Sequence, residues 1–153
     1  MKTWKQLLVI IVVTAAVLAV SGCHTVTPAT VLDASLLVGK KNIFVVVSDR
    51  KDRGFRKEIE RNLTARGFTV SSGSRNQLTA DADLSLEYED RWGWDMVMYP
   101  KWVKIAFYNA KTQELVGSAE YSNRGFHTFS DPPEITDELL GRIFGEPAGR
   151  YMD

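Results

Sequence analysis

The chain has 153 residues, of which 44% are hydrophobic and 25% charged, and its 19 basic residues balance its 19 acidic residues. This composition excludes collagen-like, low-complexity and wholly disordered proteins, and it favours a single domain. A nucleic-acid-binding protein normally carries an excess of basic residues, so the formal charge of zero argues against that class.

The N-terminal segment has the organisation of a secretory signal. Lys2 and Lys5 are the only charged residues before an apolar run over residues 7–20, which only Thr14 interrupts. A membrane-spanning helix needs about 20 apolar residues to cross about 30 Å of hydrocarbon, so this run is short for a permanent anchor. We therefore interpret residues 1–22 as a signal peptide that is removed from the mature protein.

The end of this signal, Val20-Ser21-Gly22-Cys23, resembles the lipobox of bacterial lipoproteins. In that family the cysteine sulfur is diacylated, the preceding peptide is cut off, and the new N-terminus is acylated. Cys23 is the only cysteine of the chain, and we expect it to be lipidated. An ordinary signal with an incidental cysteine and an uncleaved anchor are the alternatives.

The resemblance also implies a location. Three acyl chains, at about 0.8 kcal/mol per buried methylene group, make membrane attachment effectively permanent. Residue 24 is His rather than Asp, so the inner-membrane retention signal of enteric-type bacteria is missing and the resemblance implies the periplasmic face of the outer membrane. Lipidation of Cys23 leaves no thiol for a disulfide. The mature chain keeps 131 residues, enough for one core.

We divide the mature chain into a lipidated cysteine and tether (residues 23–41), one α+β periplasmic domain (42–146) and a C-terminal tail (147–153). The first predicted strand covers residues 42–48. Its five consecutive β-favouring residues, without polar alternation, are typical of a strand inside a sheet.

Two amphipathic helices are predicted. The first covers residues 53–66, after Asp52 as its cap, and Gly67 ends it in a Schellman motif. Its apolar residues recur every four positions, at Phe55, Ile59 and Leu63. The second begins after Asp131 with proline at its first position, and we expect it to end at Pro147.

Between the helices the pattern changes to that of strands. After a short strand over residues 68–71, polar and apolar residues alternate from Leu84 to Met96, which predicts a strand with one solvated face. A turn at Tyr99-Pro100 and strands over 102–109 and 115–122 complete a predicted antiparallel meander.

The predicted order is therefore β-α-β-β-β-β-α. It corresponds to an α+β two-layer sandwich in which two helices cover one face of a mostly antiparallel sheet of four to five strands. With its lipobox, the arrangement resembles small outer-membrane lipoproteins of Gram-negative bacteria, and its order of elements is similar to that of the lipoprotein that plugs the lipopolysaccharide translocon.

Residues suited to catalysis are scarce, so we expect no enzyme, no metal and no cofactor. His127 is the only histidine of the predicted domain, and a zinc site needs three or four ligands, usually including His or Cys. No phosphate-binding loop, dinucleotide-binding glycine motif or nucleophile elbow occurs. Five acids cluster in the sequence, at Asp81, Asp83, Glu87, Glu89 and Asp90. Their alternation with apolar residues is typical of a solvated strand face.

A basic surface is predicted on the first helix, at Arg53, Arg56 and Lys57. It is suited to anionic lipid or to an acidic protein partner. The alternative, which we favour, is an ordinary solvated helix face, because Glu58 and Glu60 are interspersed with these cations.

The stretch from residue 92 to residue 102 is unusually rich in tryptophan, tyrosine and methionine. Such side chains on a projecting hairpin suit a protein interface or a sugar-stacking surface. The candidate partner-binding residues are Trp92, Trp94, Met96, Tyr99 and Trp102. The alternative is that they lie beneath the helices as core.

These observations predict a non-enzymatic binding or envelope-assembly module, held in the membrane by its lipid and acting through the hairpin at residues 92–102. Its expected partner is an envelope protein, peptidoglycan or lipopolysaccharide, and not nucleic acid. The alternative is a hydrolase or sugar-binding protein acting on envelope polymers through Asp95, Glu120 or His127.

Overall fold

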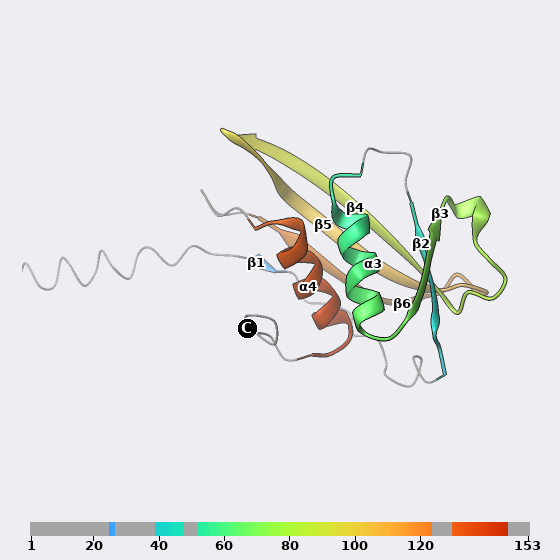
Figure 1. Ribbon diagram of the computed structural model, residues 1–153. Coiled ribbons are helices and arrows are strands. Elements are labelled where there is room, and N and C mark those ends of the chain that lie inside the picture. Colours follow the sequence, from blue (N-terminus) through green and yellow to red (C-terminus); the bar gives the residue numbers. More distant parts are fainter. Residues whose placement is uncertain (1–24, 27–38, 48–51, 124–129, 147–153) are drawn as a thin grey trace, which may run out of the picture.

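The computed structural model describes residues 25–26, 39–47, 52–123 and 130–146 (Figure 1). The predicted signal peptide, Cys23, most of the predicted tether, His127 and the predicted C-terminal tail lie outside the described residues. The elements in chain order are β1 (Thr25–Val26), β2 (Asn42–Val46), α3 (Phe55–Ala65), β3 (Thr69–Gly73), the short 3₁₀ helix η1 (Arg75–Gln77), β4 (Leu84–Asp95), β5 (Val97–Asn109), β6 (Leu115–Ser122) and α4 (Pro132–Ile143).

One mixed sheet carries the fold. Its strands lie in the order β1-β6-β5-β4-β2-β3. Strand β2 is parallel to both of its neighbours, β3 and β4, whereas β4, β5, β6 and β1 pair in antiparallel fashion. The predicted α+β fold and its order β-α-β-β-β-β-α are confirmed, and β2 lies inside the sheet as its uninterrupted apolar sequence indicates.

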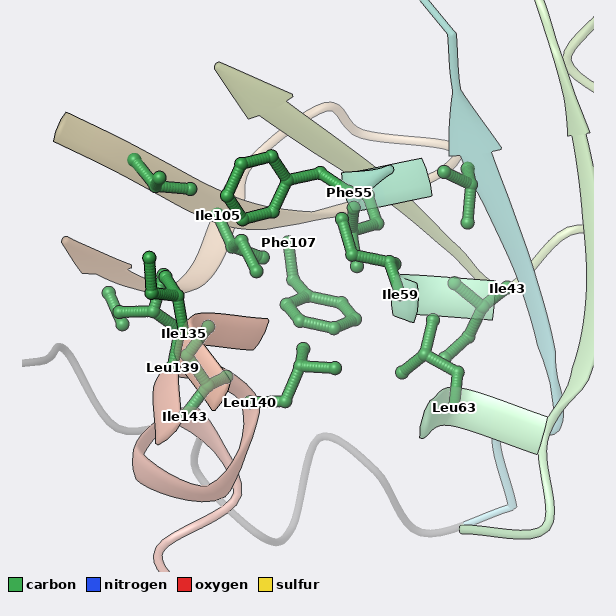
Figure 2. Packing of buried hydrophobic residues seen from close by; sticks show 14 of the residues in the cluster. Ile43, Phe55, Ile59, Leu63, Ile105, Phe107, Ile135, Leu139, Leu140 and Ile143 are labelled. Atoms are coloured by element: carbon green, nitrogen blue, oxygen red, sulfur yellow. The ribbon is translucent and has the colours of Figure 1, made fainter. Parts of the chain in front are cut away.

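Both helices lie side by side on one face of this sheet (Figure 1). Their apolar stripes and the facing side of the strands form one core, which Figure 2 shows from close by. Phe107 of β5 is fully buried between Ile59 of α3 and Leu140 of α4. Fully burying a large apolar side chain stabilises a fold by about 1.5–3 kcal/mol, so this shared core holds the two layers together.

Helix α3 begins two residues later than the sequence predicts. Oδ1 of Asp52 accepts hydrogen bonds from the backbone N–H groups of Gly54 and Arg56, at 3.1 and 3.3 Å. Gly54 has a φ of 106°, a left-handed conformation that ends the preceding loop. Asp52 therefore stabilises the first turn as predicted, but the helix starts after Gly54.

The predicted Schellman motif at the end of α3 is confirmed. Gly67 has a φ of 88° and donates its N–H to the carbonyl of Thr64 at 2.9 Å. The N–H of Phe68 bonds to the carbonyl of Leu63 at 3.2 Å. These two bonds satisfy carbonyl groups that the last turn of a helix leaves without partners.

Helix α4 begins as predicted and ends earlier. The Asp131 side chain accepts the N–H of Glu134 at 3.0 Å, which is an N-terminal cap. The helix ends at Ile143, before Gly145 with its φ of 71°, rather than at Pro147. A glycine in the left-handed region is sufficient to stop a helix, so proline is not needed here.

Two residues of the predicted tether belong to the sheet. Thr25 pairs with Ser122 and Val26 with Tyr121, which adds β1 to the free side of β6. The sequence shows no sign of this pairing, because two residues are too few for a periodic pattern.

Candidate functional site

The hairpin formed by β4 and β5 is the candidate site, and its turn differs from the predicted one. Asp95 pairs with Val97, so Met96 alone occupies the turn. Tyr99 and Pro100, where we predicted the turn, lie within β5 opposite Gly93 and Trp92. The antiparallel pairing continues beyond the helices, and in Figure 1 the hairpin projects past them at the upper left.

Most of the exposed large apolar side chains of the described residues lie at the tip of this hairpin. Trp94 is 71% exposed, Met96 84%, Val97 48% and Met98 46%. We call these four residues the apolar tip. The one further exposed large apolar residue among the described ranges, Leu115 at 55%, lies at the opposite end of the sheet.

Met96 adopts a backbone conformation that favours glycine. Its φ is 58°, in the left-handed region, where a side chain with a Cβ atom is strained by about 1 kcal/mol. A sequence optimised only for this turn would place Gly or Asn here. The turn instead presents a methionine side chain to solvent.

Trp92 is not part of the tip. Its ring packs edge-on against Phe55 of α3, with 6.1 Å between the ring centroids, and the Arg53 guanidinium lies 5.2 Å from the ring centre. The indole N–H donates to the carboxylate of Asp90. Trp92 therefore closes the core beneath the start of α3.

Trp102 lies on the face of the sheet opposite the helices. Its indole N–H donates to the Glu120 carboxylate of β6, and the Arg91 guanidinium lies 4.8 Å from the centre of its ring. Tyr99 is on the same face: a Cβ atom at Gly93 would lie 2.8 Å from Cζ of the Tyr99 ring. Because the side chains of a strand point alternately to its two faces, the five predicted aromatic and methionine residues are divided among the core, the apolar tip and the face opposite the helices, which we call the open face.

The sequence interpretation missed Val97 and Met98 of the tip and Arg91 of the open face. The turn predicted at Tyr99-Pro100 leaves Val97 and Met98 outside the predicted strands. Arg91 was not singled out because its contact with Trp102 crosses between two strands and follows from no local pattern.

The predicted basic surface on α3 is divided among several contacts. Arg53 stacks on Trp92, and Nε of Arg56 lies 3.6 Å from the Asp52 carboxylate. Lys57 is exposed. Further along the helix, Arg61 forms an ion pair with Glu58 at 2.8 Å. Several of these cations are thus engaged within the fold, as on an ordinary solvated helix face.

The acids with predicted catalytic potential are not brought together. Asp95 lies at the level of Val97 in β5 and Glu120 at the level of Lys104. At about 3.3 Å per residue, these levels are roughly 20 Å apart, whereas glycosidase carboxylates lie about 5–10 Å apart. Among the described residues, no group of three or more His, Cys, Asp or Glu side chains is placed to hold a metal.

Asp83 has a structural role. Its Oδ2 accepts the backbone N–H groups of Asn42 and Lys41, at 3.0 and 2.9 Å, where β2 begins. These two hydrogen bonds hold the pKa of Asp83 below its usual value of 3.8. The carboxylate therefore joins the start of β4 to the start of β2.

Tyr88 titrates far from neutral pH. Burial against the core, with Asp52 and Asp90 nearby, raises its pKa to about 12. A phenol that holds its proton this firmly is a poor general base at neutral pH.

The described part of the chain contains no helix that is both long enough and apolar enough to cross a membrane. No protein-family model matches the sequence, and no curated protein matches it.

Several solved structures are similar to this chain. PelC from Paraburkholderia phytofirmans, a dodecamer, is similar over 79% of this chain and 94% of its own, at 20% identity and a TM-score of 0.55. A point variant of that dodecamer in another crystal form matches over 80% of this chain and 96% of its own, at 18% identity and a TM-score of 0.50. TolB from Acinetobacter baumannii matches over 82% of this chain and 32% of its own, at 15% identity and a TM-score of 0.48.

Proposed function

We propose that this chain is an outer-membrane lipoprotein that faces the periplasm and acts as a non-enzymatic binding or envelope-assembly module. Its address rests on the signal and lipobox that end at Cys23. Its binding element is the β4–β5 hairpin. The proposed partners are an envelope protein, peptidoglycan or lipopolysaccharide.

The exposed tip of the hairpin is the observation that carries this proposal. Soluble proteins rarely present several large apolar side chains together unless they contact a partner or a membrane. Here four of them lie within five positions, and one of the four, Met96, has a strained, left-handed backbone. PelC, which has a similar fold, is a dodecamer, and this supports a role in assembly.

The address is tested with labelled palmitate in living bacteria. We expect the wild-type chain to incorporate the label and to sediment with outer membranes, and Cys23→Ala to lose the label. A Cys23→Ser variant should also lose the label, because the serine hydroxyl does not replace the thiol on which the thioether to the lipid is formed. Equal labelling of all three chains would contradict lipidation of Cys23.

The binding element is tested by photo-crosslinking from single positions in intact cells. A photoreactive residue at Trp94 or Met98 should give adducts with the protein, glycan or lipid that contacts the hairpin, because these positions lie on the exposed tip. The matched control is Leu115, which is also exposed and apolar but lies at the other end of the sheet. Equal adducts from Leu115 and the tip would contradict a role for the hairpin.

Sugar binding is the second candidate, and the open face carries it. An aromatic ring beside a carboxylate and a guanidinium, as at Trp102, Glu120 and Arg91, offers stacking together with hydrogen bonds to hydroxyl groups. Sedimentation with purified peptidoglycan separates the two candidates. Retention that Trp102→Ala abolishes and Trp94→Ala leaves unchanged would favour the sugar-binding alternative.

A further inference from the structure

The strand pairing directs the N-terminal end of β1 toward the end of the sheet that carries the apolar tip. Ser122 of β6 pairs with Trp102 of β5 on one side and with Thr25 of β1 on the other. Strand β6 runs toward the hairpin tip, and β1 is antiparallel to it. Thr25 is therefore the residue of β1 that lies nearer to the end at which the hairpin projects, and β1 and the hairpin tip both lie on the left of Figure 1.

The distance from the anchor to the sheet is short. Cys23 precedes Thr25 by two residues, which span at most about 7 Å of extended chain. The tip extends well beyond that level, because Met96 precedes Trp102 by six positions along the hairpin. At about 3.3 Å per residue, this part of the hairpin is roughly 20 Å long.

We propose that the apolar tip inserts into the interface of the phospholipid leaflet that receives the acyl chains of Cys23. This inference rests on the proposed lipidation and goes beyond the proposed function: the tip itself contacts phospholipid, and the envelope partner contacts the part of the hairpin that stays outside the leaflet. With so short a connection, a hairpin aligned with the membrane normal reaches past the lipidated residue into the leaflet. If the sheet tilts instead, the tip rests among the headgroups.

The composition of the hairpin fits a shallow position in a bilayer. Tryptophan and tyrosine prefer the membrane–water interface, where the apolar ring and the polar group are both accommodated. Lys101, at the register shift of β5, is exposed and lies two residues farther from the turn than Tyr99. At that position its ammonium group can contact anionic headgroups when the tip is in the leaflet. Asp95 adds one carboxylate beside Met96, which favours the headgroup region over the hydrocarbon core.

This position gives the open face a defined orientation. A lipid chain alone lets a protein rotate about its attachment, whereas a second contact at the tip removes part of that freedom. Trp102 and Glu120 would then be held at a constant height above the leaflet, available to a second partner.

The single cysteine permits a direct test on the complete, acylated protein. Lipidation blocks the sulfur of Cys23, so Met96→Cys introduces the one reactive thiol for an environment-sensitive fluorophore. The matched control is Leu115→Cys, at the opposite end of the sheet. Both proteins are reconstituted in vesicles of phosphatidylethanolamine and phosphatidylglycerol that contain lipid with a nitroxide quencher.

We expect the fluorophore at position 96 to be blue-shifted and quenched several-fold more strongly than at position 115. Adding Trp94→Ser should weaken that quenching about threefold or more, without changing the melting temperature, because Trp94 is exposed in the fold. Equal quenching at both positions overturns the inference. A blue-shifted fluorophore at position 96 in native envelopes, with no such shift in vesicles, also overturns the inference and indicates that a protein covers the tip.

Failure of the proposed lipidation is recognised separately. Labelled palmitate and vesicle sedimentation are measured on the same samples. If palmitate is present and quenching is equal at positions 96 and 115, only the membrane contact of the tip is overturned, and the lipidation stands. Absence of palmitate overturns both proposals, because the short connection from Cys23 to the sheet would then no longer bring the tip to a leaflet.

Discussion

Met96 shows how a single residue can depart from what its backbone favours. Its φ of 58° strains any residue with a side chain, and its side chain, 84% exposed, gains no burial in return. Gln113 adopts a similar φ of 60° in the connection between β5 and β6, at the other end of the sheet. There, however, the side chain is hydrogen-bonded to the carbonyl of Ala110 at 2.9 Å. The strain at Met96 has no comparable local compensation.

Met96→Gly should therefore raise the free energy of unfolding by about 1 kcal/mol, because glycine adopts this conformation freely. Chemical denaturation measures the change. Contact between the hairpin and its partner should decrease in the same variant, as measured by crosslinking from Trp94. Gln113→Gly is the control: it relieves the same backbone strain and should leave crosslinking unchanged. A loss of stability in Met96→Gly would contradict the assignment of strain.

Strand β2 and strand β4 are joined by a charged side chain as well as by their parallel pairing. The Asp83 carboxylate accepts the N–H groups of Lys41 and Asn42, just before Ile43 pairs with Leu84. Parallel pairs have no tight turn to set their register. This carboxylate therefore helps to align two strands that are separated by a helix and another strand in the sequence.

Asp83→Asn should cost about 1 kcal/mol at neutral pH, because an amide oxygen is a weaker acceptor than a carboxylate. The pKa of Asp83 is below 3.8 in the folded protein, so its stabilisation is complete above that value and is lost as pH falls through the lowered pKa. The difference in unfolding free energy between wild type and variant should thus shrink in acid. A difference that is constant down to about pH 2 would contradict this role.

The whole molecule is held together by one core between the sheet and two helices. The C-terminal ends of the helices are also joined: the Arg66 guanidinium makes two hydrogen bonds to the Glu146 carboxylate, at 3.1 and 3.0 Å. Asn62 of α3 donates to Asp137 of α4 at 2.7 Å. No residue of the apolar tip belongs to this core, so removing an exposed tip side chain such as Trp94, with no change in backbone strain, should leave the stability unchanged.

Phe107→Ala should destabilise the molecule by about 3–5 kcal/mol, because it removes a ring that packs against the sheet and both helices. Leu115→Ala, at an exposed apolar position, should change the unfolding free energy by no more than about 0.5 kcal/mol. The urea midpoint measures both changes. Similar midpoints for the two variants would contradict the central place of Phe107.

Much of the fold could be predicted because its signals are local. The apolar stripe of α3, the cap at Asp131 and the left-handed glycine at Gly67 each depend on residues only a few positions apart. The alternation along β4 likewise identified its solvated face. These local signals agree with one another, and together they predict two helices packed on one face of a sheet.

The candidate site could be predicted only in part. The composition of the stretch from Trp92 to Trp102 indicates a binding surface, but it does not show which of these residues are exposed. Exposure depends on where the turn lies, and a left-handed methionine is not among the usual signals for a turn. Placing the turn at Met96 instead of Tyr99-Pro100 brings Val97 and Met98 to the tip.

The alternation of apolar residues, the caps and the glycines thus define the helices and most strands, because each acts within one element. The division of the tryptophans among core, tip and open face comes from pairing between strands, and so does the placement of Thr25 beside Ser122. Residues 25 and 122 are far apart in the sequence, and their contact forms only once the whole sheet is assembled. A pattern confined to a few neighbouring residues carries no information about such contacts.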